Sequence, residues 1–297
     1  MKKVKSKNSI SIYLVVVLTI LLIYSILMFS LLGWGVMKSL QTREDYILSN
    51  SSAYSIPKEW TLQNYIDAFN QIHYKFRDEE GLHYVYFGEM VFNSLFYSIG
   101  CTIVSTLTPC VIAYLTIKYD FRFNKVLNFI VYFTMLVHFL GSMPSSIKVV
   151  TALGLIDTWP GIFIMKFNFL GQYYLIFQGI FRGLSREYSE AAIIDGASDF
   201  TLMVKINFPL IFNSIIIVAV LEFIGYWNDY QTPMVYLRSH PTVSYGLYYF
   251  NGINDSKFGM LIYKVAGFML MMLPTLLLFL IFKNKMIGNL TIGGLKG

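Results

Sequence analysis

The chain has 297 residues, of which 56% are hydrophobic and only 13% are charged. An ordinary soluble domain carries about 25% charged residues, so the composition excludes a typical water-soluble protein and favours one that resides in a lipid bilayer. The formal net charge of +6 does not indicate a nucleic-acid-binding protein, because the sequence shows no basic face with stacking aromatic residues on a soluble fold.

Six apolar stretches bounded by charged residues follow one another along the chain. A helix needs roughly twenty such residues to cross the hydrocarbon core, so the pattern predicts an all-α integral membrane protein with six membrane-spanning helices. The first stretch is longer than the apolar region of a secretory signal and no small-x-small cleavage site follows it, so we expect an uncleaved span. The predicted spans are residues 12–36, 92–117, 126–142, 161–181, 209–230 and 258–282.

Lysine and arginine gather before the first span, between the second and third, between the fourth and fifth, and after the sixth. Because short cytoplasmic loops are enriched in cations, we expect both termini in the cytoplasm. The chain then divides into a cytoplasmic N-terminus with the first span (1–36), an extracellular loop (37–90) and a core membrane domain (91–297). The core domain carries a cytoplasmic loop (183–208) and a cytoplasmic C-terminal tail (283–297).

The loop 183–208 contains residues that are typical of helix starts and helix ends. Ser185 can act as an N-cap with Glu187 in the first turn, where the helix dipole favours an anion. Gly196 can take the left-handed conformation that ends a helix, Ser198 can cap a second helix, and Pro209 suits the first turn of the next span. We therefore predict a helix, a tight turn, a second helix and then the membrane.

Small residues in this loop suggest a surface that a partner protein can cover. Ala191 and Ala192 leave a shallow surface, and Gly196 allows another backbone to approach closely. The alternative from physical chemistry alone is an amphipathic loop that lies on the membrane surface.

The spacing of these residues resembles the cytoplasmic EAA loop shared by the membrane subunits of binding-protein-dependent ABC importers. That loop reads Glu-Ala-Ala, three residues, Gly, nine residues, Ile-x-Leu-Pro, and its sugar-importing branch adds Asp-Gly-Ala. Phe208 and Ser185 depart from the pattern, where the family usually has Leu and often has Pro. The matching positions are Glu190, Ala191, Ala192, Asp195, Gly196, Ala197, Ile206 and Pro209.

The C-terminus, residues 289–297, is similar to the closing segment of maltose-type carbohydrate permeases, apart from Asn289 at its start. The resemblance implies a tail that contacts a partner subunit through Thr291, Gly293, Gly294 and Lys296.

What the resemblance implies is a six-helix ABC importer permease bundle in the bacterial plasma membrane. This permease would form the pathway for a carbohydrate, an oligosaccharide, together with a second homologous permease. Two ATPase subunits would hold ATP and Mg²⁺, and an extracytoplasmic binding protein would deliver the solute. The sequence contains no phosphate-binding loop, His-Glu-x-x-His pair or Gly-x-Ser-x-Gly elbow, so we expect no catalytic residue, no metal and no cofactor on this chain.

Two further groups are candidates for contacts with solute and binding protein. A polar and aromatic patch in the fifth span could line the pathway, although helix packing and an interfacial aromatic belt are alternatives. The loop after that span could reach the binding protein, with an aromatic belt again as the alternative. Lys166 lies within a predicted span, where ionisable side chains are often functional, and its alternative is to snorkel outward. The patch consists of Glu222, Tyr226, Trp227, Asn228 and Asp229, and the loop candidates are Tyr245, Tyr248 and Tyr249.

Other functions fit the sequence less well. The same architecture could import an oligopeptide or a polyamine, but the Asp-Gly-Ala match and the tail favour carbohydrate. A membrane-embedded transferase would need clustered His, Asp or Glu at the membrane face, and an ion-coupled carrier would show internal symmetry between its halves; neither feature is visible.

Overall fold

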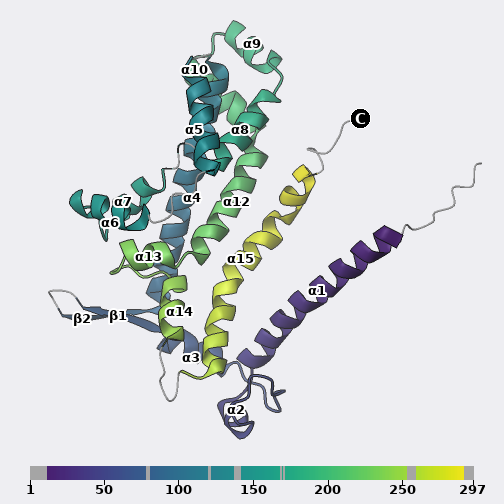
Figure 1. Cartoon of the computed structure of the whole chain (residues 1–297), viewed down its shortest axis with the longest axis vertical. Helices are drawn as coiled ribbons and strands as arrows, with labels where there is room; N and C mark the ends of the chain where they lie inside the picture. Colours follow the sequence, from purple (N-terminus) through teal and green to yellow (C-terminus); the bar gives the residue numbers. More distant parts are fainter. Residues whose placement is uncertain are drawn as a thin grey trace, which may run out of the picture. The chain divides into compact units, whose positions relative to one another are not determined.

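The computed structural model describes residues 12–77, 81–119, 122–136, 142–167, 169, 171–252 and 259–290 (Figure 1). The chain forms two compact units. The first comprises Met1–Gln71 with Ile253–Leu270, and the second comprises Ile72–Gly252 with Met271–Gly297.

The first unit contains the long helix α1 (Ile12–Ser39), the short helices α2 (Arg43–Leu48) and α3 (Gln63–Gln71), and the beginning of α15 (Leu261–Leu290). Most apolar side chains of α1 are exposed around its whole circumference. A helix that is apolar all round is typical of a membrane span, because lipid rather than protein covers it.

A buried lysine organises the segment that follows α1. Lys38 is fully buried, and its amine donates hydrogen bonds to Gln41 Oε1 (2.9 Å), Ser52 O (3.0 Å) and Ser55 Oγ (2.7 Å). Gln41 in turn donates to the carboxylate of Asp45 (3.0 Å). A buried cation is tolerated only when it is paired and hydrogen-bonded, so this network ties the end of α1 to the chain on both sides of α2.

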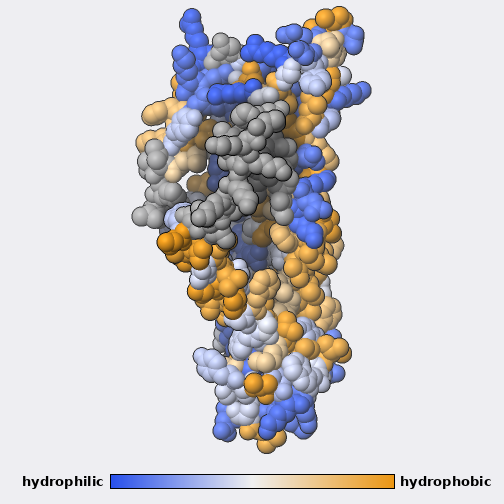
Figure 2. All heavy atoms as spheres, turned by 90° about the vertical axis from the view of Figure 1, so that its right-hand side faces the viewer, coloured by the Kyte–Doolittle hydropathy of each residue, from blue (hydrophilic) through white to orange (hydrophobic). Residues whose placement is uncertain are grey.

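The second unit is built around α4 (Phe87–Lys118), against which α8 (Gln172–Arg182) and α12 (Phe212–Asn228) pack. Buried residues of α4, α5, α8 and α12 form one continuous apolar core, in which Phe177 is fully buried. Figure 2 shows hydrophilic residues gathered at the end of this unit that carries α9 and α10. The remaining helices here are α5 (Asn124–Leu136), α6 (Ser142–Ala152), α7 (Trp159–Met165), α13 (Gln231–Tyr236) and α14 (Val243–Asn251).

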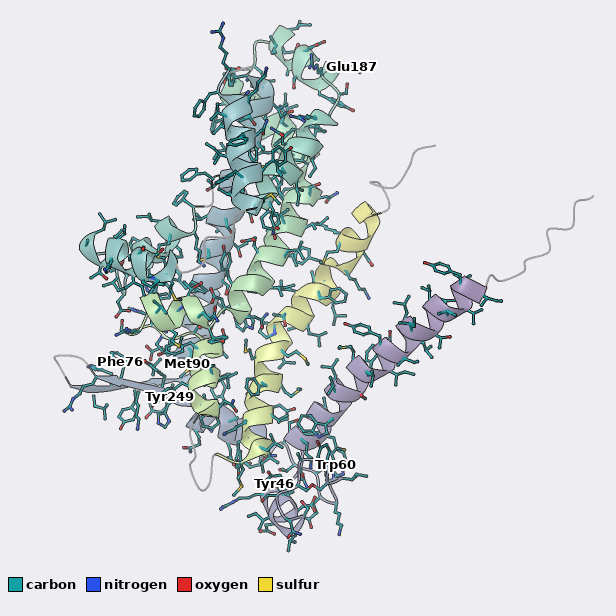
Figure 3. All side chains as sticks on the ribbon, in the orientation of Figure 1. Tyr46, Trp60, Phe76, Met90, Glu187 and Tyr249 are labelled. Atoms are coloured by element: carbon teal, nitrogen blue, oxygen red, sulfur yellow. The ribbon has the colours of Figure 1, made fainter. Side chains whose placement is uncertain are left out.

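A two-stranded antiparallel hairpin precedes α4. Strands β1 (His73–Arg77) and β2 (Leu82–Tyr86) pair with His73 opposite Tyr86. Tyr74 packs against Tyr245 and Tyr249 of α14, with ring centroids 4.9 and 5.0 Å apart. In Figure 3 the labelled Phe76, Met90 and Tyr249 lie in this region, whereas Tyr46 and Trp60 belong to the first unit and Glu187 lies on α9.

Three described helices are long and apolar enough to cross a membrane: residues 12–39, 87–118 and 261–286. They confirm the predicted first, second and sixth spans. A fourth candidate is the pair Asp199–Leu210 and Phe212–Asn228, which is bent by 75° and contains the predicted fifth span. The described residues therefore contain three or four such spans.

The predicted fourth span, residues 161–181, is wrong as a single helix. It is divided into α7, which ends at Met165, and α8, which begins at Gln172. Lys166 ends α7 by donating its backbone N–H to carbonyl groups of the last turn, and Gly171 precedes α8 in an extended conformation. The predicted third span corresponds in part to α5, while residues 137–141 lie outside the described residues.

Candidate functional site

The loop 183–208 begins with the short helix α9 (Glu187–Ile194), which ends at a left-handed glycine. Gly196 has a φ of 80°, and two backbone hydrogen bonds close the turn. They run from Gly196 N to Ile193 O (3.0 Å) and from Ala197 N to Ala192 O (2.9 Å). This Schellman arrangement satisfies the last carbonyl groups of a helix, and it confirms the predicted conformation of Gly196.

The start of α9 differs slightly from the prediction. Arg186 precedes the helix with helical φ and ψ and makes no side-chain capping bond. The residue before Arg186, Ser185, accepts a hydrogen bond through its Oγ from Glu187 N (3.3 Å). Ser185 therefore satisfies a helix N–H as predicted, although the helix begins one residue later than a simple cap would place it.

The second half of the loop leads into the membrane through irregular helix. Ser198 Oγ accepts a hydrogen bond from Thr201 N (3.3 Å), which confirms Ser198 as the N-cap of α10 (Asp199–Thr201). A π-helical stretch, η1 (Leu202–Asn207), and the single turn α11 (Phe208–Leu210) follow before the chain bends into α12. Pro209 has no N–H and its ring crowds the carbonyl four residues earlier, which accounts for the departure from regular α-helix here.

Asp199 ties this loop to the end of α4. Its carboxylate forms an ion pair with Lys118, the last residue of α4, and accepts a hydrogen bond from the hydroxyl of Tyr119. The bond to Asp199 raises the pKa of Tyr119 above its ordinary value. The loop is thus attached to the core helix of the second unit at one defined point.

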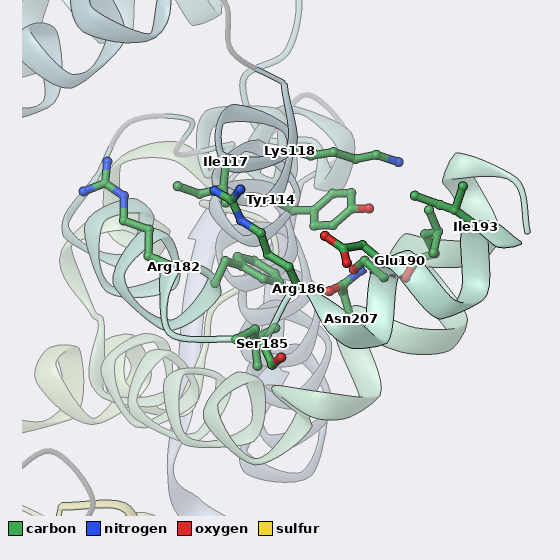
Figure 4. A pocket seen from close by; sticks show the side chains of 13 residues that line it. Tyr114, Ile117, Lys118, Arg182, Ser185, Arg186, Glu190, Ile193 and Asn207 are labelled. Atoms are coloured by element: carbon green, nitrogen blue, oxygen red, sulfur yellow. Dashed lines mark hydrogen bonds between the residues drawn. The ribbon is translucent and has the colours of Figure 1, made fainter. Parts of the chain in front are cut away.

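Helix α9 presents two faces. One face lines a pocket of about 630 Å³ between α9 and the ends of α4 and α8. Its residues recur at a spacing of three and four positions: Arg186, just before the helix, and Ser189, Glu190 and Ile193 within it. Figure 4 shows Glu190 on one side of this pocket. The other face carries exposed apolar side chains, above all Ile194, which is 86% exposed.

The predicted coupling residues are spread along this loop. Ala191, Asp195, Gly196 and Pro209 are exposed, Ala197 and Ile206 are half-buried, and Ala192 is buried. A Cβ added to Gly196 would meet no atom of this chain within 4 Å. The predicted tail contacts, Thr291, Gly293, Gly294 and Lys296, lie outside the described residues.

Asp229, at the end of α12, joins four segments of the second unit. Its carboxylate accepts hydrogen bonds from the hydroxyl of Tyr97 on α4 (2.8 Å) and from the backbone N–H of Thr232 (3.0 Å). Lys166 lies 3.7 Å from the same carboxylate, donates to Thr232 Oγ1 (3.3 Å), and sits 5.0 Å from the ring centroid of Tyr226. The alternative in which Lys166 snorkels outward is therefore wrong, because Asp229 supplies a countercharge inside the protein.

The rest of the predicted pathway patch does not form one surface. Trp227 is buried and donates to Met271 O (2.9 Å), so it packs α12 against α15. Asn228 is exposed and donates to Ile224 O of its own helix (2.8 Å). Glu222 is half-buried and lies beside Tyr173 and Tyr226. The polar part of the patch is therefore Glu222, Tyr226 and Asp229.

The three tyrosines after α13 have different environments. Tyr245 is buried, and its hydroxyl donates to that of Tyr74 on the hairpin (2.8 Å). Tyr249 is half-buried against the same residue. Tyr248 is exposed and stacks on Tyr230 with centroids 4.5 Å apart. Of the three, Tyr248 presents its ring most openly to a partner.

Sequence reasoning missed the partners of Asp199 and Asp229. Lys118 entered the sequence argument only as a cation that marks the cytoplasmic side, and it lies 81 positions from Asp199. Lys166, the partner of Asp229, is likewise distant from it in sequence: it lies 66 positions from Thr232, to which it also donates. A search for lone acids and lone bases at the ends of predicted spans would have listed all four charges, although it would not have paired them.

Comparison with known families identifies the architecture. Residues 100–287 match the family described as "Binding-protein-dependent transport system inner membrane component". The chain belongs to this family. It is therefore a transport component of the bacterial plasma membrane that crosses the bilayer several times, and the resemblance seen in the EAA loop is confirmed.

Individual relatives of this inner membrane component are named for oligosaccharide transport. The arabinooligosaccharides transport system permease protein AraQ of Halalkalibacterium halodurans is 28% identical over 249 residues, 81% of each chain. The diacetylchitobiose uptake system permease protein NgcG of Streptomyces coelicolor is 23% identical and covers 92% of this chain and 86% of its own length.

A solved structure supports the fold. The crystal structure of a bacterial ABC transporter involved in the import of the acidic polysaccharide alginate contains a chain that matches with a TM-score of 0.71 at 20% identity. The match covers 92% of this chain and 96% of the other.

Proposed function

We propose that this chain is a membrane permease subunit of an ATP-driven oligosaccharide importer. Family membership and the relatives named for arabinooligosaccharide and diacetylchitobiose transport support this proposal. The chain forms the solute pathway with a second homologous permease, both of its termini lie in the cytoplasm, and an extracytoplasmic binding protein delivers the sugar. ATP and Mg²⁺ bind to two partner ATPase subunits, so this chain performs no chemistry.

The observation that carries the proposal is the construction of the loop 183–208. Helix α9 exposes three apolar side chains close together, Tyr188, Ile193 and Ile194, and such a group on a surface is typical of a site that a partner covers. The loop is held to α4 through Asp199, and it continues through η1 and α11 into α12. An ATPase subunit that binds α9 can therefore displace α12 relative to its neighbours.

The opposite end of α12 is where that displacement reaches the solute pathway. Asp229 connects α12 to Tyr97 on α4 and to Lys166 at the end of α7. Glu222 and Tyr226 on the same helix offer a carboxylate, a hydroxyl and an aromatic face, which are the groups that sugars bind. Movement of α12 would change the spacing of these groups.

The energy required sets a scale for the coupling. Moving a two-state equilibrium from 1:99 to 99:1 takes about 5.5 kcal/mol of differential binding. Burial of an exposed side chain such as Ile194 can contribute about 1.5–3 kcal/mol. A charged contact to Glu190 would add to this, since hydrogen bonds to charged groups contribute about 1.5–3 kcal/mol each.

Co-purification and sugar uptake test the proposal. The importer is reconstituted in vesicles with its ATPase subunits, and uptake of labelled arabino- and chito-oligosaccharides is measured. We expect Glu190→Ala and Gly196→Val to lower both ATPase association and uptake. Glu187→Ala removes an exposed acid from the same helix outside the pocket and should leave both unchanged. Unchanged uptake and association in Glu190→Ala and Gly196→Val would refute the proposed coupling.

A further inference from the structure

The pocket beneath α9 lies where two helices of the second unit end. Its walls include Ile117 and Lys118 at the end of α4, and Phe181 and Arg182 at the end of α8. Because α4 is a membrane-spanning helix that ends at Lys118, the pocket lies at the depth where its apolar surface gives way to water. On the proposed topology this is the cytoplasmic headgroup layer, so the inference rests on the proposed function for its sidedness.

The charges that line the pocket favour an anion. Three cations, Lys118, Arg182 and Arg186, line it together with a single acid, Glu190. Lys118 is already paired with Asp199. Arg182 and Arg186 are exposed, and neither forms an ion pair with any residue that the structure describes. In Figure 4 Arg182 lies on the side of the pocket away from Glu190, and Arg186 lies between these two residues.

The remaining walls of the pocket are apolar. Ile117, Phe181 and Leu184 line it on the side of the membrane helices, and Ile193 and Leu202 line it from α9 and η1. A volume of about 630 Å³ exceeds what a free phosphate ion would fill. A pocket with apolar walls beside two arginines matches a molecule that carries both an anionic headgroup and a hydrocarbon chain.

We propose that this pocket binds the headgroup of an anionic phospholipid from the cytoplasmic leaflet. Arg182 and Arg186 hold the phosphate, since the guanidinium fork matches phosphate oxygens in pairs. Basic pockets between membrane helices on the cytoplasmic side are known to suit such headgroups. The first acyl carbons lie along Ile117 and Leu184.

The location gives the lipid a role in coupling. Arg182 is the last residue of α8, whereas Arg186 immediately precedes α9. A phosphate held by both fixes the angle at which α9 leaves the core. The exposed face of α9 that carries Ile194 stays open to the ATPase subunit. Glu190 lines the pocket but is itself exposed, so the ATPase subunit can reach its carboxylate while the arginines hold the lipid.

Native mass spectrometry of the purified full chain tests this inference. The chain is exchanged into detergent containing phosphatidylglycerol or phosphatidylcholine, and retained lipid is counted. The variant carries Arg182→Gln and Arg186→Gln. The matched control carries Arg122→Gln and Lys125→Gln, two exposed cations at the start of α5 that do not line the pocket. Each lost contact weakens attraction to an anionic headgroup by about fivefold, so we expect phosphatidylglycerol to bind about 25-fold more weakly to the variant than to the wild type.

The outcomes separate the possible ligands. We expect selective retention of phosphatidylglycerol by the wild type and the control, without displacement by millimolar inorganic phosphate. Equal retention of both lipids, displacement by phosphate, or loss of the lipid when the ATPase subunits bind would overturn the inference. Failure of sugar uptake with lipid selectivity intact would count against the proposed function alone.

Discussion

The turn at Gly196 offers a test of how loop geometry controls docking. Its φ of 80° costs a residue with a Cβ roughly 1–2 kcal/mol, and a β-branched residue more. If the backbone relaxes instead, the two hydrogen bonds that close the turn are lost, at about 0.5–1.5 kcal/mol each. Gly196→Val should therefore misplace the end of α9 at a cost of about 1–3 kcal/mol, which corresponds to roughly 5- to 150-fold weaker binding of the ATPase subunit.

The assay is a titration of reconstituted permease with labelled ATPase subunit, paired with a thermal unfolding measurement of each variant. Gly196→Asn is the matched control, because asparagine tolerates the left-handed conformation, and it should bind within a few-fold of the wild type. The space around Gly196 is open within this chain, so side-chain size alone does not limit the substitution. Wild-type affinity in Gly196→Val, or equal loss in both variants, would refute the conformational reasoning.

Three other predictions follow from single contacts. Asp229→Asn leaves the amine of Lys166 without its countercharge. Because both side chains are about one-fifth exposed, we expect the free energy of unfolding to fall by no more than the ~3–5 kcal/mol typical of a fully buried pair. The denaturation midpoint measures this loss. Gly161→Ala should disrupt the start of α7, because its Cβ would lie 2.1 Å from a backbone oxygen, whereas Gly179→Ala meets open space and should be tolerated, as thermal unfolding will reveal. The backbone N–H of Lys58 holds the pKa of Asp45 below its ordinary value, so the stabilisation that this carboxylate gives is present above that value and is lost as pH falls below it. The protection factors of the amides of residues 42–58, measured by hydrogen exchange, should fall with acidification in the wild type and not in Asp45→Asn.

Local chemistry explains why the coupling loop could be predicted. The conformation of Gly196 and the cap at Ser198 depend on residues within one helical turn, and both were found as expected. Long apolar runs likewise predicted α1, α4 and α15, because a membrane span is defined by composition over its own length.

The interruption of the predicted fourth span and the pairing of charges depend on distant residues. Composition alone predicted a span at residues 161–181, while Lys166 in the first third of that stretch is stabilised by Asp229 from another segment. Tyr245 was expected at a partner surface but packs on Tyr74, because the hairpin folds back onto α14. No pattern within a short window encodes these contacts.

Thiol crosslinking from α9 tests the central claim most directly. Both native cysteines, Cys101 and Cys110, are buried on α4, so a cysteine at position 194 should be the accessible thiol. We expect Ile194→Cys to crosslink to the ATPase subunit in the assembled importer, with a yield that changes when ATP binds. No crosslink under any nucleotide condition, or sugar transport by the purified chain without an ATPase, would contradict the proposed coupling.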